Sequence, residues 1–493
     1  MRTIHDSQLK LGQVDIATLK FDPKSRDDIP QVLKGLQHLY CNKELRKSIF
    51  KLLEENIAPN KNKSTGRPGM NLWNIFVMGV LRLDLNWDYD RLHDQVNNHL
   101  QIRQMLGHSD LLEPLYYHPQ TIKDNVCLLT PELLEKINIE IVNSGHQLLK
   151  KKENEPLRGR CDSFVVETNV HYPTDITLLY DAMRKLLLVG KKISAIQNHT
   201  NWRQHAYHQK KIKNKMRSIQ KKNYTSGKDL EKKKQEKRQD YQEYIERCKF
   251  SLEKVRATLC EFEASEGFYG KGEQLKKEAE QYIIHAERQI LQIKQRVMEG
   301  KTIPHCEKVF SVFEPHTEWI VKGKAGVPQE LGLRVCVLED SNQFFLHHLV
   351  MQKETDKDVC LSMVKEAQRK FPSLKMCSFD KGFHSPENQK ELKEYLDVVA
   401  LRRKGKLSEA SKAIESSEEF KKAQAKHSAV ESGINALEVH GLDRCPDHGL
   451  EGFQRYVALA IVARNIQRIG AILRNQEIKR EERKKRKLFK KIA

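Results

Sequence analysis

The sequence has 493 residues, and its 87 Lys and Arg against 66 Asp and Glu give a formal net charge of +21 and an isoelectric point near 9.3. This length predicts about three domains and is ample for a buried core. So basic a chain favours a polyanionic partner, with DNA or RNA first and an anionic membrane surface second.

The apolar segments predict neither a membrane span nor an exported protein. The most apolar one, residues 72–85, contains Arg82 and Asp84 and is too short to cross a bilayer. The first ten residues contain no apolar segment, so we expect no secretory signal. The ten cysteines include no C-x-x-C pair, which favours a reduced, intracellular protein.

Residues 1–150 predict a helical N-terminal domain. After the break GRPG at residues 66–69, apolar residues at helical spacing predict a helix over 72–83. Two more helices are expected, at 88–98 and from Pro131 onward. Short helices with basic loops suit a DNA-binding module, in which Arg67 would be a candidate DNA contact. A plain helical support domain explains the same pattern equally well.

Residues 160–167 are apolar and β-branched, which predicts a strand. The chain from 203 to 300 is instead rich in Lys, Glu and Gln, with two apolar series in alternating steps of four and three. These series are Tyr241, Ile245, Cys248, Leu252, Val255, Leu259 and Phe262, then Ala279, Ile283, Ala286, Ile290, Ile293 and Val297. Two such helices joined by EGFYGKG predict an antiparallel, coiled-coil-like hairpin. Because strand patterns resume afterwards, we expect this hairpin to be inserted into another domain.

Strands and helices alternate in the rest of the chain. Strands are expected at 331–338, 344–351, 374–380 and 398–402, and helices at 358–370, 387–395, 425–440 and 452–473. This order predicts an α/β domain with a mixed sheet over residues 155–475, and it fits an RNase H-like core. Residues 476–493 form a basic C-terminal tail that we expect to be solvated or loosely helical and open to phosphates.

Three acidic residues stand out in this pattern. Asp162 lies in the first strand, Asp380 ends the strand at 374–380, and Glu431 lies in a polar stripe of a helix. Phosphodiesters hydrolyse very slowly, and two cations about 3.5 to 4 Å apart can activate the nucleophile and stabilise the leaving oxygen. Magnesium prefers oxygen ligands, and strands and packed helices hold such ligands more rigidly than loops do.

Each acid also has an ordinary structural explanation. Asp162 would simply start a strand, and Asp380, which precedes Lys-Gly, would be a turn residue. Glu431 would be an exposed helical residue, as most glutamates on helices are. The combined placement on strand, strand and helix favours one shared site.

Three segments resemble the catalytic motifs of bacterial insertion-sequence transposases of the DDE superfamily, closest to the ISNCY group. They are DSFVVETNVHYPTD (162–175), FDKGFHSPEN (379–388) and KHSAVESGINALEVHGLDRCPDHGLEGFQRYVALAIVARN (426–465). Residues 66–107 are similar to the helical domain that precedes the core of such enzymes. The resemblance covers most of the chain; its first motif is highly specific, whereas the second alone is weak.

This resemblance implies that Asp162, Asp380 and Glu431 are the metal-binding catalytic triad of an RNase H-like domain interrupted by the hairpin at 203–300. It implies two Mg²⁺ or Mn²⁺ ions per active site. The partners would be double-stranded DNA, namely the terminal inverted repeats and the target, and further copies of the chain in a homodimer or higher synaptic multimer, with no membrane. The enzyme would be prokaryotic, cytoplasmic and nucleoid-associated.

Two rival interpretations remain open. A nuclease or resolvase with the same fold would share the three acids but would lack end-specific binding and strand transfer. A catalytically silent, transposase-derived DNA-binding protein would keep the affinity for DNA alone.

The chain departs from the family pattern around Glu431. Many related transposases carry a Tyr, an Arg and a Lys four and seven residues to either side of the catalytic Glu, but Gln424, His427 and Glu438 stand there. Lys426 or His427 would then replace the usual phosphate contacts.

Further candidate DNA contacts flank the other motifs. Lys381 and His384 follow the second acid, and Lys322 and Lys324 lie in the basic and aromatic segment EPHTEWIVKGK. Trp319 in that segment is either a base-stacking residue or part of the core.

Overall fold

The computed structural model describes the whole chain except residues 1, 6–7, 10, 58–68, 110–114, 152–154, 224–229, 265–269, 322–328, 406–407 and 493. The chain divides into two compact units. The first, residues 1–169 with 320–493, is called the sheet unit below, and the second, residues 170–319, is called the helical unit. The helical unit therefore starts earlier and ends later than the predicted insertion at 203–300, and the predicted N-terminal domain falls within the same unit as the sheet.

The N-terminal part of the sheet unit is helical, as predicted, and includes the three helices expected at 72–83, at 88–98 and from Pro131. Its helices are η1 (Ile16–Thr18), α1 (Ile29–Cys41), α2 (Lys43–Ile57), α3 (Leu72–Asp84), α4 (Tyr89–Asn98), α5 (Leu100–Met105), α6 (Pro119–Val126) and α7 (Pro131–Leu148). The start of α7 could be predicted because typical helix-start residues stand there: the Thr130 side chain caps the helix and Pro131 occupies its first turn.

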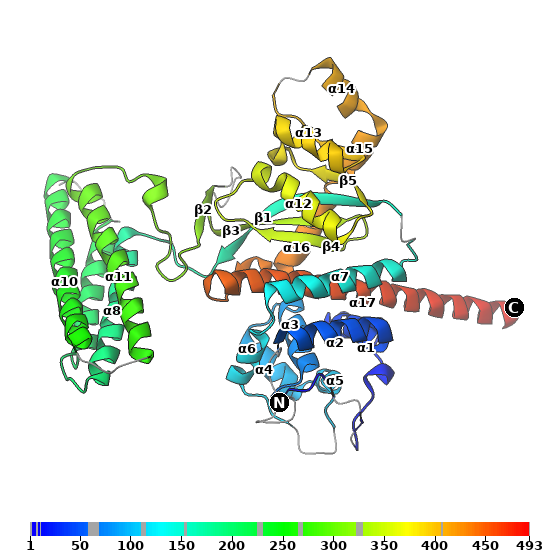
Figure 1. Ribbon diagram of the computed structural model, residues 1–493, viewed down its shortest axis with the longest axis horizontal. Coiled ribbons are helices and arrows are strands. Elements are labelled where there is room, and N and C mark those ends of the chain that lie inside the picture. Colours follow the sequence, from blue (N-terminus) through cyan, green and yellow to red (C-terminus); the bar gives the residue numbers. More distant parts are fainter. Residues whose placement is uncertain are drawn as a thin grey trace. The chain divides into compact units, whose positions relative to one another are not determined.

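The fold is mixed α/β, and the described residues form a mixed sheet of seven strands (Figure 1). The strands are β1 (Leu157–Thr168), β2 (Glu318–Val321), β3 (Gln329–Asp340), β4 (Phe345–Val350), β5 (Leu374–Phe379), β6 (Val398–Leu401) and β7 (Arg444–Cys445). The main order is β2-β3-β1-β5-β6, with β4 also paired to β3 and β7 to β1. β1 runs antiparallel to β3 and parallel to β5, and β5 runs parallel to β6. The predicted strands are confirmed within one or two residues at most of their ends.

The remaining helices of the sheet unit are α12 (Asp356–Lys370), η4 (Lys381–Phe383), α13 (Pro386–Tyr395), α14 (Glu409–Ser416), α15 (Glu418–Ala425), α16 (Ala429–Leu437), η5 (Glu438–Leu442) and α17 (Gly449–Ile492). Side chains of a strand alternate between its two faces. Ser163 of β1 bonds to α12, whereas Arg160 bonds to the backbone of Lys426 just before α16. The α12 and α16 helices therefore cover opposite faces of β1.

Helix α17 is the central support of the sheet unit. It contacts α1, α3, α7 and β4 (Figure 1), and one hydrophobic core joins the N-terminal helices, the sheet and α17. Two glycines allow α1 and α17 to approach closely, because a Cβ on Gly35 would lie 2.3 Å from the Ile466 carbonyl oxygen and one on Gly470 would lie 2.0 Å from that of Gln31. α17 is long and apolar enough to cross a membrane, but 78% of its apolar window is buried, which is typical of the core helix of a soluble protein.

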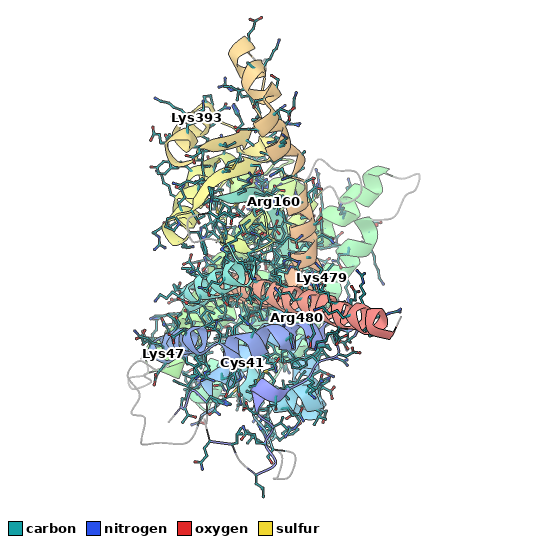
Figure 2. All side chains as sticks on the ribbon, turned by 90° about the vertical axis from the view of Figure 1, so that its right-hand side faces the viewer. Cys41, Lys47, Arg160, Lys393, Lys479 and Arg480 are labelled. Atoms are coloured by element: carbon teal, nitrogen blue, oxygen red, sulfur yellow. The ribbon has the colours of Figure 1, made fainter. Side chains whose placement is uncertain are left out.

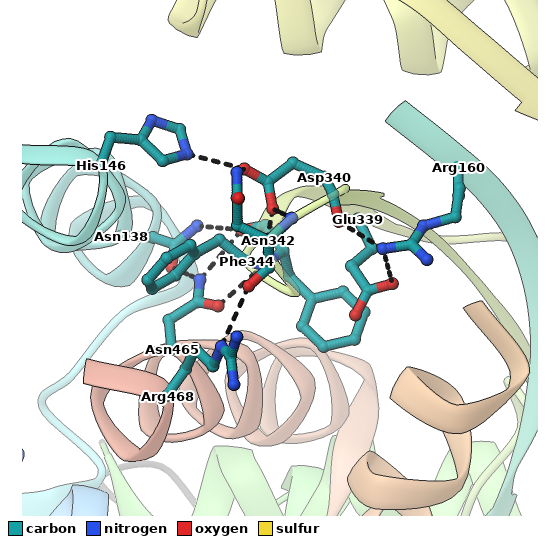
Figure 3. Close-up of polar contacts among 10 residues, drawn as sticks. Asn138, His146, Arg160, Glu339, Asp340, Asn342, Phe344, Asn465 and Arg468 are labelled. Atoms are coloured by element: carbon teal, nitrogen blue, oxygen red, sulfur yellow. Dashed lines mark hydrogen bonds and ion pairs between the residues drawn. The ribbon is translucent and has the colours of Figure 1, made fainter. Parts of the chain in front are cut away.

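A buried polar network fixes the turn between β3 and β4 to α7 and α17 (Figure 3). Asp340 accepts hydrogen bonds from the backbone N–H groups of Asn342 and Phe344 and pairs with His146 of α7 at 2.7 Å. Arg468 of α17 donates to the carbonyl of Asn342 at 3.0 Å. Because these polar groups are hydrogen-bonded to one another, the turn between β3 and β4 is held rigidly against α7 and α17.

The helical unit contains α8 (Asp175–Ile196), α9 (His205–Asn223), α10 (Leu230–Ala264), α11 (Lys271–Ile293), the π-helical turn η2 (Lys294–Met298) and η3 (His305–Glu307). The two predicted long helices are present as α10 and α11, and most of EGFYGKG lies outside the described residues. Both helices also pack on α8, and α9 packs on α8 and α10. The unit is therefore a helical bundle with its own core, larger than the hairpin expected from the sequence.

Candidate active site

The pairing of β1 with β5 places two of the predicted acids at adjacent positions on neighbouring strands. The parallel register pairs Cys161 with Phe379. Asp162 and Asp380 are the next residues along the chain from this last paired position, so Asp162 lies within β1 and Asp380 directly follows the end of β5. This juxtaposition depends on strand pairing across more than two hundred residues of chain.

Asp162 lies on the face of β1 that α16 covers, because Arg160, two residues earlier, also faces that side. Helix α16 contacts β1 and carries Glu431 in its first turn. Val430 and Ile434 are buried and anchor the helix, whereas Glu431 is exposed. The helix thus presents Glu431 from the same side of the sheet as Asp162.

Three other carboxylates influence the charge of Asp162. Burial raises the pKa of Asp162 to about 6, and the carboxylates of Asp380, Asp356 and Glu431 add to this rise. The backbone N–H of Ser163, which donates to Oδ1 at 2.8 Å, opposes it. Like charges raise a pKa only at short range. The structure therefore brings the three predicted acids, with Asp356 as a fourth, into one electrostatic environment.

Asp356 was not anticipated from the sequence. It lies in the first turn of α12, where its Oδ1 accepts a hydrogen bond from the Ser163 hydroxyl at 2.6 Å. A Cβ added to Gly382 would lie 2.9 Å from Asp356 Oδ2 and 3.7 Å from Asp380 Oδ2. Two carboxylate oxygens therefore approach the same side of the turn after β5, with only a glycine between them.

A sequence signal for Asp356 did exist. The segment TDKD contains Thr355, which caps α12 in a capping box with Asp358. A helix predicted to begin at the cap, rather than at Asp358, would have placed Asp356 at its N-terminus. Its approach to Asp380 is nevertheless a tertiary contact that local pattern cannot show.

His427 lies in the same neighbourhood. Burial lowers its pKa, and the carboxylates of Asp380 and Glu431 partly oppose this change. Its Nδ1 pairs with the Ser378 hydroxyl at 3.0 Å, while Nε2 has no hydrogen-bond partner in the described parts of the chain. A neutral imidazole with one unused nitrogen stands beside the acids. This matches the prediction that His427 is close to the site, although its role with DNA stays a prediction.

The other two unusual positions around Glu431 have structural contacts. Gln424, where the family has a different residue, donates to the carbonyl of Ala400 at 2.6 Å and to that of Phe379 at 3.4 Å. It thereby ties α15 to the ends of β5 and β6. Glu438 is half-buried in the π-helical turn η5 that follows α16.

The donor chemistry of the cluster suits a hard cation, since carboxylate oxygens are the ligands that Mg²⁺ and Mn²⁺ prefer. Among the described residues, however, no group of three or more His, Cys, Asp or Glu side chains is already close enough to hold a metal ion. The carboxylates of Asp162, Asp356, Asp380 and Glu431 share an environment but do not yet enclose an ion. The residues therefore match the cation in ligand type, but among the described residues they are not grouped closely enough to hold it.

Of the remaining predicted DNA contacts, Arg67, Lys322 and Lys324 lie outside the described residues. Lys381 is exposed at the start of η4, directly after Asp380. His384 is engaged within the same turn, with Nε2 3.3 Å from Gln389 Oε1.

The last predicted DNA contact, Lys426, is exposed next to His427. In the helical unit, the Trp319 ring contacts those of Tyr172 and Phe310, with ring centroids 5.5 and 5.6 Å apart. Trp319 is half-buried beside these rings and belongs to neither of the two buried hydrophobic cores, so whether it stacks on bases stays a prediction.

Basic side chains gather at the end of α17. The predicted tail at 476–493 is helical through Ile492, and Figure 2 labels Lys479 and Arg480 on it. Among the residues here whose side chains are described, the exposed cations are Lys479, Arg480, Arg483, Lys484, Lys485, Arg486 and Lys487. A solvated row of charges on a helix is available to phosphate groups.

No protein-family model, curated protein or solved structure matches this chain.

Proposed function

We propose that this chain is a DDE-type DNA transposase that cleaves phosphodiester bonds at the ends of a mobile element and transfers the freed strand to target DNA. The observation that carries this proposal is the convergence of Asp162, Asp380 and Glu431, from two strands and a helix, in one electrostatic environment. The net charge of +21 supports a DNA substrate.

The strand arrangement supports an RNase H-like assignment for the core. In the order β4-β3-β1-β5-β6, the first two pairings are antiparallel and the next two are parallel. An RNase H-like domain needs an acid on its central strand, an acid at the end of the neighbouring parallel strand and a third on a later helix. Asp162, Asp380 and Glu431 occupy these positions.

In the proposed reaction, Asp162, Asp380 and Glu431, assisted by Asp356, would hold Mg²⁺ or Mn²⁺. Bound cations would activate the attacking hydroxyl and stabilise the leaving oxygen of the phosphodiester. The protein positions these carboxylates on rigid elements, and neutral His427 would donate from Nε2 to a non-bridging phosphate oxygen. Cleavage would free a 3′-hydroxyl, which would attack a target phosphodiester at the same site.

The partners and setting follow from this reaction. The chain would bind terminal inverted repeats and target DNA as a homodimer or larger synaptic complex. It would act in the prokaryotic cytoplasm near the nucleoid, and the exposed cations of α17 would add sequence-independent affinity.

Strand cleavage and strand transfer on DNA carrying the element ends test the proposal. Asp162→Asn, Asp380→Asn and Glu431→Gln should each abolish both reactions in Mg²⁺ and leave DNA-end binding intact. Full cleavage by any of these variants would refute that residue's role.

Two further outcomes separate the rival interpretations. Cleavage without transfer by the unaltered protein would instead indicate a nuclease or resolvase. DNA binding without cleavage or cation uptake would indicate a silent DNA-binding protein.

A further inference from the structure

A cavity of about 700 Å³ lies between the sheet and the helices α15 and α16. Met376 of β5 and Val398 of β6 form part of its floor, and Ala423 of α15 lies opposite. Arg158 of β1 and Lys426, between α15 and α16, line its side. Pockets of about 300 to 1,000 Å³ accommodate small organic ligands. The cavity is therefore large enough for an organic group and not only for an ion.

The cavity adjoins the carboxylate cluster. Arg160 lines it and lies on the same face of β1 as Asp162, two residues away. Ser378 also lines it, two residues before Asp380, and its hydroxyl pairs with His427. A ligand in the cavity would thus lie directly beside the proposed reaction centre.

Its walls carry more positive than negative charge. Five cationic side chains and two carboxylates line it, and the cations are Lys151, Arg158, Arg160, Lys422 and Lys426. Arg160 pairs with Glu339 and Lys422 pairs with Glu418. The other three cationic side chains make no hydrogen bond or ion pair with any described residue. Unpaired cations around a half-enclosed space favour an anionic ligand, and charge-assisted bonds to phosphate are among the stronger polar contacts.

The floor of the cavity is apolar, in contrast to its cationic walls. Met376, Val398 and Ala423 are half-buried and apolar, and a flexible thioether such as that of Met376 adapts to flat and irregular groups. Inorganic phosphate would use the cationic wall but leave the floor and most of the volume empty. A ligand with one phosphate and one planar apolar group would use both.

We propose that this cavity binds a single nucleotide, with its phosphate at Arg158 and Lys426 and its base against Met376, Val398 and Ala423. The source of the nucleotide rests on the proposed function: it would be a nucleotide of the bound DNA that is turned out of its strand beside the carboxylates. A free nucleotide offers the same chemistry, so the test includes both sources.

Binding is measured by titration calorimetry on the full chain in EDTA, which makes it independent of the proposed cations. The probes are deoxyadenosine 5′-monophosphate, deoxyadenosine and inorganic phosphate. We expect one molecule of the nucleotide to bind per chain, with the nucleoside and phosphate each at least about tenfold weaker. Equal affinity for phosphate and nucleotide would overturn the role of the apolar floor.

Variants locate the site. Arg158→Gln and Lys426→Gln should each weaken nucleotide binding about tenfold, and Ala423→Trp should block it by filling the cavity. Lys421→Gln is the matched control, because Lys421 is exposed on α15 but does not line the cavity. Unchanged affinity in all three cavity variants would overturn the proposal.

A DNA duplex carrying 2-aminopurine next to the cleavage site distinguishes the sources. A rise in fluorescence on binding the protein, lost in Ala423→Trp and kept in Asp162→Asn, would support a nucleotide turned out of DNA. A free nucleotide that binds without any fluorescence change in the duplex would support the cavity but contradict the DNA source. Absent cleavage by the unaltered protein would refute the proposed function alone.

Discussion

The hydroxyl of Ser163 donates a 2.6 Å hydrogen bond to the carboxylate of Asp356, joining β1 to the first turn of α12. The bond holds Asp356 on the α12 side of β1, and its charge adds to those of Asp380 and Glu431 in raising the pKa of Asp162. Like charges near the partly buried carboxylate of Asp162 disfavour its charged form unless a cation compensates them. This arrangement is the physical reason to expect cation binding here.

Asp356→Asn should weaken cation binding by the four carboxylates without changing the fold. The variant loses one of four negative charges near the proposed cations, and replacing a residue that orients metal ligands typically costs about 10- to 100-fold in metal affinity. We therefore expect the Mg²⁺ concentration for half-maximal cleavage to rise at least about tenfold. Asp358→Asn is the control, since Asp358 caps the same helix turn through Thr355 but is fully exposed. An equal effect of both substitutions would contradict the role of Asp356.

Gly382→Ala should impair cleavage more than stability. The added Cβ would lie 2.9 Å from Asp356 Oδ2, so the Asp356 carboxylate must move away from that of Asp380. A misplacement near 1 Å can reduce a catalytic rate on the order of 100-fold, while a carboxylate at the end of a side chain can shift at little cost in folding. The rate of cleavage and the melting temperature are compared with those of Gly452→Ala, where the nearest atom would be 3.5 Å from the new Cβ. Normal cleavage by Gly382→Ala would show that the two carboxylates need not be adjacent.

Asp447→Asn should destabilise the protein in a pH-dependent way. Asp447 pairs with buried Arg82 at 2.7 Å and with Arg455 at 3.1 Å. Burial alone would raise the pKa of Asp447, but the two guanidinium groups outweigh it and lower the pKa below its usual 3.8. The stabilisation is therefore present above pH 3.8 and is lost as the pH falls through the lower pKa of the folded state.

At pH 7 the variant leaves Arg82 buried without its charged partner, which costs about 3 to 5 kcal/mol. Urea unfolding should show this deficit unchanged from pH 8 to 5 and shrinking below pH 4. The control is Glu167→Gln, which breaks the exposed pair with Arg444 and should cost under about 1 kcal/mol. A deficit for Asp447→Asn that is no larger than the control would mean that this buried pair does not stabilise the fold.

Neutralising the basic end of α17 should weaken sequence-independent DNA binding. The triple variant Lys479→Gln, Arg480→Gln and Lys484→Gln removes three exposed cations. If all three contact phosphates, the slope of log K against log salt should fall by about 2 to 3. Binding of a random duplex is measured by fluorescence anisotropy across salt concentrations, with melting temperature as the check on folding. An unchanged slope would place the DNA elsewhere on the protein.

Much of the fold was predictable because its signals are local. Apolar runs such as residues 374–380 gave the strands, and alternating steps of three and four gave α10 and α11. The end of α17 was predicted less well, since residues after 473 lack an apolar stripe but consist of good helix formers. The region around Glu431 was also predicted only in part, because one helix was expected at 425–440, where α16 and a π-helical turn occur, and α14 and α15 before it were not expected. Positive φ at Gly441 marks the break within that turn.

The candidate site was predictable only in part. Asp162, Asp380 and Glu431 could be picked out because local patterns predict the strand that contains Asp162, the strand that Asp380 follows and the helix that carries Glu431. Asp356 and the cavity arise from contacts between elements far apart in the chain, such as Ser163 with Asp356. Such contacts follow from sheet pairing and helix packing, which local sequence patterns do not specify.

Cation binding by the carboxylate cluster tests the account most directly. Mn²⁺ uptake by the full chain is followed by electron paramagnetic resonance, with Asp162→Asn, Asp380→Asn and Glu431→Gln measured beside Asp358→Asn. We expect the unaltered protein and Asp358→Asn to bind Mn²⁺ with equal affinity and each triad variant to lose this binding. Equal uptake by all five proteins, or none by the unaltered protein, would contradict it.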